Sequence, residues 1–268
     1  MAMPVARWRY RATLCALFLL CSLALAHARS QTTAATANWG TGFVVSEGYV
    51  LTAFHVVQGR AALQLGPVGG KWLPAELVQS DAKLDLALLR APISLPAVAL
   101  ASSGEVPIGL EVSVIGYPLP KFQGLSKKIT QGIVNGARSE AQQAQDVGLF
   151  QISAEVSRGN SGGPVFAADG SVIGMVQRKI DARKLSEQGE DLVVNVNYAL
   201  RSSQIIKFLQ AGVVIPQVQG LSLVSVLRPY QVFERSQASV LAIVGRDAAA
   251  APSTGTRPAE RTPESPRP

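Results

Sequence analysis

The sequence has 268 residues, with 25 Lys and Arg against 18 Asp and Glu and a formal net charge of +7. No stripe of Lys and Arg with interleaved aromatic residues is present, so this charge gives no support to nucleic-acid binding. Only two cysteines and two histidines occur, which leaves little material for a metal site built from thiolates and imidazoles.

The first 28 residues are predicted to be a signal peptide. Three arginines among the first 11 residues precede an uncharged apolar run at 12–26, and Ala26-His27-Ala28 offers small residues to a signal peptidase. We therefore expect cleavage after Ala28 and an exported protein, either periplasmic or secreted. The alternative is an uncleaved anchor and membrane contact only through it, but 15 apolar residues fall short of the roughly 20 that span a bilayer.

Loss of this leader restricts the chemistry that remains. The mature chain would have 240 residues and a charge of +4, too mild to require an anionic partner. Cys15, Cys21 and His27 would leave with the leader, which excludes disulfides and thiol catalysis and makes His55 the only histidine. We expect no catalytic metal and no cofactor, while a structural calcium ion stays open.

Residues 38–200 read as short strands and turns, which is typical of antiparallel sandwiches or barrels. Each predicted strand is bounded by Gly, Pro, Asn, Asp or Ser. The strands are expected at 42–46, 49–53, 61–65, 75–78, 85–89, 112–117, 128–134, 149–153, 165–167 and 172–177. The Pro-rich stretch 91–107 is the expected join between two halves.

The C-terminal part is predicted to contain one helix, an extension and a tail. Ser202 can cap a helix over 202–210 with Ile205, Ile206 and Leu209 on one face. Residues 212–246 keep a β-prone character and would add a strand or two, being too few for a domain of typical size. Residues 247–268 are rich in Pro and Ala and are expected to be disordered.

The stretch Arg158-Gly-Asn-Ser-Gly-Gly-Pro-Val165 contains a candidate nucleophile, Ser161. It fits both the G-x-S-x-G elbow of α/β-hydrolases and the G-N-S-G-G of serine proteases. A serine hydroxyl needs a nearby base, and the base needs an orienting group. No histidine follows Ser161, which excludes the α/β-hydrolase order, and no aspartate lies between residue 29 and His55, which argues against the subtilisin order. The remaining order is His55, an aspartate, then Ser161.

Asp85 is the preferred aspartate. It begins the apolar run Leu84-Asp-Leu-Ala-Leu-Leu89, where a carboxylate is costly to bury unless it is paired, and a histidine N–H is a suitable partner. Asp81 lies in a turn-like stretch and is expected to be solvated, while Asp146 and Asp169 are remote choices.

Several segments together carry a resemblance to a known family. They are 38–45, 48–57, 84–89, 115–118, 130–134, 158–164 and 172–174, read as NWGTGFVV, GYVLTAFHVV, LDLALL, IGYP, TQGIV, RGNSGGP and VIG. Over roughly residues 38–210 the chain resembles trypsin-like serine proteases of the bacterial HtrA/Deg branch. It departs from that branch in having no room for a PDZ domain after the protease.

The resemblance implies an all-β, chymotrypsin-like fold of two six-stranded antiparallel barrels with a short C-terminal helix. A segment 29–37 would precede the protease domain of residues 38–211. The first barrel, about 38–104, would carry His55 and Asp85, and the second, about 105–200, would carry Ser161. The N–H groups of Gly159 and Ser161 would stabilise the oxyanion.

Two further expectations concern the loops of the site. Asn160 has no charge and cannot form the ion pair that an aspartate makes with a newly cut N-terminus in trypsin-like zymogens, so activity is expected to depend on the order of loops 155–160 and 178–190. The pocket candidates are Glu155, Arg158, Gln177 and Arg178. Glu155 would select Arg or Lys before the cleaved bond, unless it faces solvent or is neutralised by Arg158, Arg178 and Lys179.

The sequence thus predicts an exported serine endopeptidase acting on protein or peptide substrates in turnover or quality control. The alternative is a catalytically silent binding or chaperone-like module on the same fold. The oligomeric state is not indicated by the sequence.

Overall fold

The computed structural model describes residues 37–102, 105–137, 148–179, 196–212 and 214–247. The predicted leader 1–28, nearly all of segment 29–37 and all of the tail except Asp247 lie outside these residues. Within the described part, no helix combines the length and the apolar character that crossing a bilayer requires.

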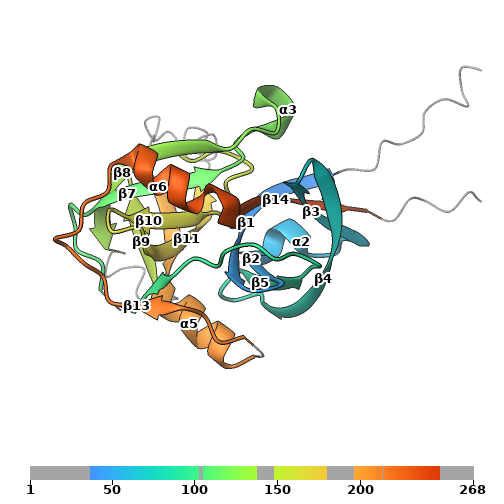
Figure 1. Ribbon diagram of the computed structural model, residues 1–268, viewed down its shortest axis with the longest axis horizontal. Coiled ribbons are helices and arrows are strands. Elements are labelled where there is room, and N and C mark those ends of the chain that lie inside the picture. Colours follow the sequence, from blue (N-terminus) through green and yellow to red (C-terminus); the bar gives the residue numbers. More distant parts are fainter. Residues whose placement is uncertain (1–36, 103–104, 138–147, 180–195, 213, 248–268) are drawn as a thin grey trace, which may run out of the picture. The chain divides into compact units, whose positions relative to one another are not determined.

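Six antiparallel strands form a closed first barrel (Figure 1). They follow one another in space as β1 (Ala37–Ser46), β14 (Val240–Arg246), β3 (Ala62–Val68), β4 (Lys71–Asp81), β5 (Leu86–Arg90) and β2 (Tyr49–Ala53). Apolar residues of these strands fill the interior, because closure hides one face of every strand from water. The largest fully buried side chains among them are Phe43, Leu51, Leu65, Leu86, Leu88 and Leu89.

The sixth strand of this barrel comes from the C-terminal end of the described chain, which corrects the expected boundary of about 38–104. β14 pairs with β1 on one side, with Ala242 opposite Thr41, and with β3 on the other, with Ile243 opposite Leu65. Residues 240–244 are at most 2% exposed. Without β14, the edges of β1 and β3 would be unpaired, so the segment expected as an extension is part of the barrel wall.

A second ring of six strands forms the other barrel, which confirms the predicted fold class. Its strands are β7 (Glu111–Gly116), β8 (Lys128–Ala137), β9 (Leu149–Ile152), β12 (Asn197–Arg201), β11 (Val172–Lys179) and β10 (Pro164–Ala167), and β10 pairs back with β7. Two short strands, β6 (Leu100–Ala101) and β13 (Val218–Gln219), extend from β11 in parallel. Its separate core includes Val114, Val134, Phe150, Ile152, Val165 and Ile173.

Short helices complete the structure. α2 (Phe54–Val57) follows β2, α3 (Pro120–Gln123) follows β7, and α5 (Ser202–Gln210) covers the residues of the predicted helix. Residues 212–246, expected to be β-prone, also contain α6 (Pro229–Ser236) and the 3-10 turn η2 (Gln237–Ser239).

α6 differs from the β-prone expectation for a local reason. Pro229 occupies its first turn, and the Gln231 side chain accepts a hydrogen bond from the Arg228 N–H at 2.9 Å, which satisfies a free donor at the helix start. Val232 is buried. α6 lies against the second barrel and leads through η2 into β14 (Figure 1).

Candidate active site

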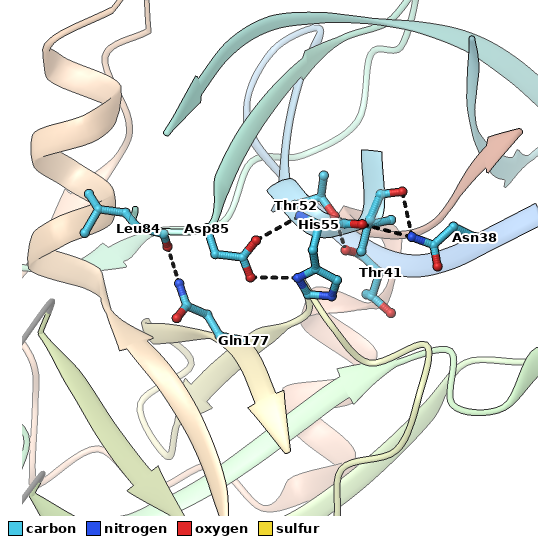
Figure 2. Close-up of polar contacts among 8 residues, drawn as sticks. Asn38, Thr41, Thr52, His55, Leu84, Asp85 and Gln177 are labelled. Atoms are coloured by element: carbon cyan, nitrogen blue, oxygen red, sulfur yellow. Dashed lines mark hydrogen bonds and ion pairs between the residues drawn. The ribbon is translucent and has the colours of Figure 1, made fainter. Parts of the chain in front are cut away.

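His55 and Asp85 form the central pair of the site (Figure 2). His55 Nδ1 and Asp85 Oδ2 are 2.7 Å apart, and the His55 backbone N–H donates to Asp85 Oδ1 at 2.9 Å. Both oxygens of the Asp85 carboxylate are therefore bonded to His55. The two side chains are 46% and 25% exposed, so solvent reaches both of them.

The turn before β5 sets the direction of Asp85. Asp81 Oδ1 accepts the N–H groups of Lys83 and Leu84, both at 2.9 Å, so Asp81 caps this turn, in keeping with its expected turn-like setting. Asp85 itself has a φ of +54° and lies just before β5, one residue outside the strand in which it was expected. Its carbonyl accepts the Phe54 N–H at 3.1 Å, which joins the turn to the start of α2.

Asn38 on β1 supports the histidine from the other side. Its Nδ2 donates to the carbonyls of His55 at 3.0 Å and Val56 at 3.1 Å (Figure 2). Both carbonyls belong to the four-residue helix α2, and the last carbonyls of a helix need partners from outside it. Asn38 lies opposite Gly245 of β14, so the C-terminal strand backs the element that carries His55.

Thr41 of the first barrel fixes the loop that carries Ser161. The Thr41 N–H donates to the Ser161 carbonyl at 2.9 Å, and Thr41 Oγ1 donates to the Gly159 carbonyl at 2.6 Å. The same Oγ1 accepts the Tyr117 N–H at 3.1 Å. Thr41 is fully buried, so these bonds are protected from competition with water.

Two glycines of this loop lie where no side chain fits. Gly159 has a φ of +102°, and a Cβ there would lie 2.2 Å from the Tyr117 carbonyl oxygen. Gly162 has a φ of +82°, and a Cβ there would lie 2.4 Å from the Thr41 oxygen and 2.6 Å from the Ala53 nitrogen. Gly162, the residue after Ser161, therefore lies directly against the end of β2, which leads into His55.

The peptide between Arg158 and Gly159 has a defined orientation. The Arg158 carbonyl accepts the Leu119 N–H at 2.7 Å. In a trans peptide the N–H points away from the carbonyl, so the Gly159 N–H is directed away from Leu119. Among the hydrogen bonds of the described residues, neither the Gly159 N–H nor the Ser161 N–H is a donor, and both are available to an oxyanion.

The predicted pocket residues differ in exposure and in bonding partners. Glu155 and Arg158 have exposed side chains, and no ion pair of the described residues includes either of them. Gln177 is 8% exposed and its Nε2 donates to the Leu84 carbonyl, beside Asp85 (Figure 2). The backbone of Arg178 lies in β11 opposite Tyr198; its side chain and residues 180–190 of loop 178–190 lie outside the described part of the chain.

Sequence reasoning missed Thr41, Asn38 and Tyr117. Thr41 could have been found by the reasoning that selected Asp85, since it is a polar residue in a strand whose neighbours are buried. Tyr117 is 2% exposed, and burial raises the pKa of its phenol to about 12. In the described part of the chain, no three or more His, Cys, Asp or Glu residues gather as metal ligands would.

Several known proteins resemble this chain in sequence. The profile of the trypsin-like peptidase domain matches residues 40–175, a range that includes His55, Asp85 and Ser161. The uncharacterized protein y4bJ of Sinorhizobium fredii is 38% identical over 65% of this chain and 27% of its own length. A probable periplasmic serine endoprotease DegP-like protein of Halomonas elongata is 34% identical over 60% of this chain and 33% of its own length.

A solved structure gives the same result at the level of the fold. It is described as the HtrA-type protease AlgW with decapeptide, is 27% identical, and superposes with a TM-score of 0.54. The match covers 64% of this chain and 50% of that one. The chain therefore spans half of this structure and about a third or less of the two curated relatives.

Proposed function

Because the chain belongs to the trypsin-like peptidase family, in its HtrA/DegP branch, we propose that it is an exported serine endopeptidase in which Ser161, His55 and Asp85 form the catalytic triad. The observation that carries this proposal is the 2.7 Å contact between His55 Nδ1 and Asp85 Oδ2, next to a serine loop whose free N–H groups belong to Gly159 and Ser161.

The reaction follows from these positions. Asp85 accepts a hydrogen bond from His55 Nδ1–H and so leaves Nε2 of His55 as the proton acceptor. His55 takes the proton of Ser161 as Oγ attacks the peptide carbonyl, and then gives it to the leaving amine. The N–H groups of Gly159 and Ser161 donate to the oxygen that becomes negative, and one such donor is worth about 2.7–4 kcal/mol.

One contact of this mechanism forms with the substrate. No hydrogen bond of the described residues joins Ser161 Oγ to His55. Catalytic hydrogen bonds often tighten only in the complex with substrate. Ser161 is only partly exposed and its carbonyl accepts the Thr41 N–H, so its backbone is held in place while this contact forms.

We assign a peptide or protein as the substrate and protein turnover or quality control as the role. The support is the family and the decapeptide named with the similar HtrA-type structure. Export is supported by the leader-like start of the sequence and by the periplasmic relative. An N-terminal sequence of the secreted protein that begins before residue 29 would contradict cleavage after Ala28.

Fluorophosphonate labelling tests the activity directly. This reagent reacts with a serine only when the serine is activated, so the wild type should be labelled at Ser161 and should cleave a denatured protein. Ser161→Ala should lose both properties, while Ser94→Ala, which alters an exposed serine, should keep both. A wild type that folds but is not labelled would favour the catalytically silent binding module instead.

A further inference from the structure

Gln177 makes a contact that a pocket residue would not be expected to make. It follows the buried stretch of residues 171–176 on β11 and is itself 8% exposed. Its Nε2 donates to the Leu84 carbonyl, so a side chain of the second barrel reaches the backbone of the first (Figure 2).

The Leu84 carbonyl belongs to the peptide that precedes Asp85. Asp85 has a φ of +54°, a left-handed conformation that is uncommon for a residue with a side chain. Such a conformation persists only when its surroundings enforce it. The bonds from Phe54 and His55 act on Asp85 from within the first barrel, whereas the bond from Gln177 acts on the preceding peptide from the second.

The residue next to Gln177 is bonded twice to the serine loop. The Val176 carbonyl accepts the Gly162 N–H, and the Val176 N–H donates to the Gly163 carbonyl, both at 2.8 Å. Neighbouring residues of one strand therefore contact the loop of Ser161 and the peptide that orients Asp85. A displacement of β11 would change the alignment of both groups with His55.

We propose that Gln177 is a positioning residue that aligns Asp85 with the serine loop across the two barrels. This inference rests on the proposed triad. Gln177 does not need to touch the substrate in this role, and it acts on the reaction through the direction of the Asp85 carboxylate and hence through His55.

The test compares Gln177→Met, which keeps the length of the side chain but removes the donor, with a matched control. Gln79→Met is that control, because Gln79 Nε2 donates to the Phe208 carbonyl at 2.8 Å, a bond of the same kind between other elements. Gln177→Met should lower kcat and the rate of fluorophosphonate labelling by about 10–100-fold, as a misaligned catalytic group does. KM should change less than about twofold, since binding is not the step affected.

A spectroscopic measurement distinguishes a change at the His55–Asp85 bond from a general loss of stability. The low-field proton resonance of His55 Nδ1–H reports its bond to Asp85. It should broaden or shift in Gln177→Met and in the isosteric Gln177→Glu, and it should stay in place in Gln79→Met. Urea unfolding of each variant checks that it is folded under the assay conditions.

The outcomes separate the two proposals. A raised KM and an altered residue preference at the cleaved bond, with labelling unchanged, would place Gln177 in the substrate pocket and overturn the inference. Wild-type kcat and an unchanged resonance in Gln177→Met would also overturn it. A wild type that is not labelled would instead refute the proposed activity.

Discussion

Replacing Thr41 by valine should disable the serine loop without touching a triad residue. Valine has nearly the shape of threonine but cannot bond to the Gly159 carbonyl or the Tyr117 N–H, which Thr41 Oγ1 contacts at 2.6 and 3.1 Å. Each buried group left without a partner costs about 1–3 kcal/mol. The free energy of unfolding should therefore fall by about 2–6 kcal/mol if the loop stays in place.

Activity should fall because the loop can recover part of this free energy by changing its conformation. If the Gly159 carbonyl turns to find another partner, the loop recovers about 1–3 kcal/mol by leaving its catalytic arrangement. A preference of that size lowers the competent population about 5- to 150-fold. The rate of fluorophosphonate labelling should fall by the same factor, because labelling requires the formed loop.

Two variants control this experiment. Thr41→Ser keeps the hydroxyl and should restore most of the labelling rate. Ser202→Ala removes another buried hydroxyl, whose Oγ donates to the Ala101 carbonyl at 2.7 Å, and should lower stability with no effect on labelling. Labelling of Thr41→Val at the wild-type rate, alongside a clear loss in urea stability, would refute the reasoning.

Three further predictions concern other parts of the site and fold. Gly159→Ala should lower kcat by about 100- to 1000-fold by displacing an oxyanion donor. The control Gly70→Ala, at a residue with a φ of +80° and no atom within 4 Å of the added Cβ, should lower only stability. Equal kcat values for the two variants would contradict this. A chain ending at residue 239 should fail to fold by circular dichroism, because four large apolar residues of β14 are each worth about 1.5–3 kcal/mol, whereas a chain ending at 247 should behave as the full chain. Because burial raises the pKa of Tyr117 from 10.0 to about 12, its neutral phenol should stabilise the fold fully below about pH 10 and lose this effect as the pH rises through about 12; Tyr117→Phe should flatten the fall in urea midpoint over that range.

Local patterns in the sequence predict much of the fold. Turn residues between short apolar runs mark most strands, and the apolar face of 202–210 gives the bounds of α5. The choice of Asp85 rested on the cost of a carboxylate in an apolar run, and the structure pairs that carboxylate with His55. The role of the pair in catalysis remains a prediction.

Contacts between distant segments were not predictable in the same way. Residues 240–244 read as a buried strand, but nothing local in them indicates β1 and β3 as partners, since pairing depends on which edges remain open. Gln177 is similar: its position after an apolar run shows that it needs a partner, but only the packing of the barrels identifies the Leu84 carbonyl.

The placement of β14 also determines when the first barrel can close during synthesis of the chain. The first barrel cannot close until β14, which begins at Val240, has been synthesised, whereas its first strand already ends at Ser46. At about 5–20 residues per second, a ribosome needs roughly 10–40 s to make the chain between them. Asn38, which bonds to the His55 carbonyl, lies opposite Gly245 of β14, so a nascent or interrupted chain lacks the strand that supports the surroundings of His55.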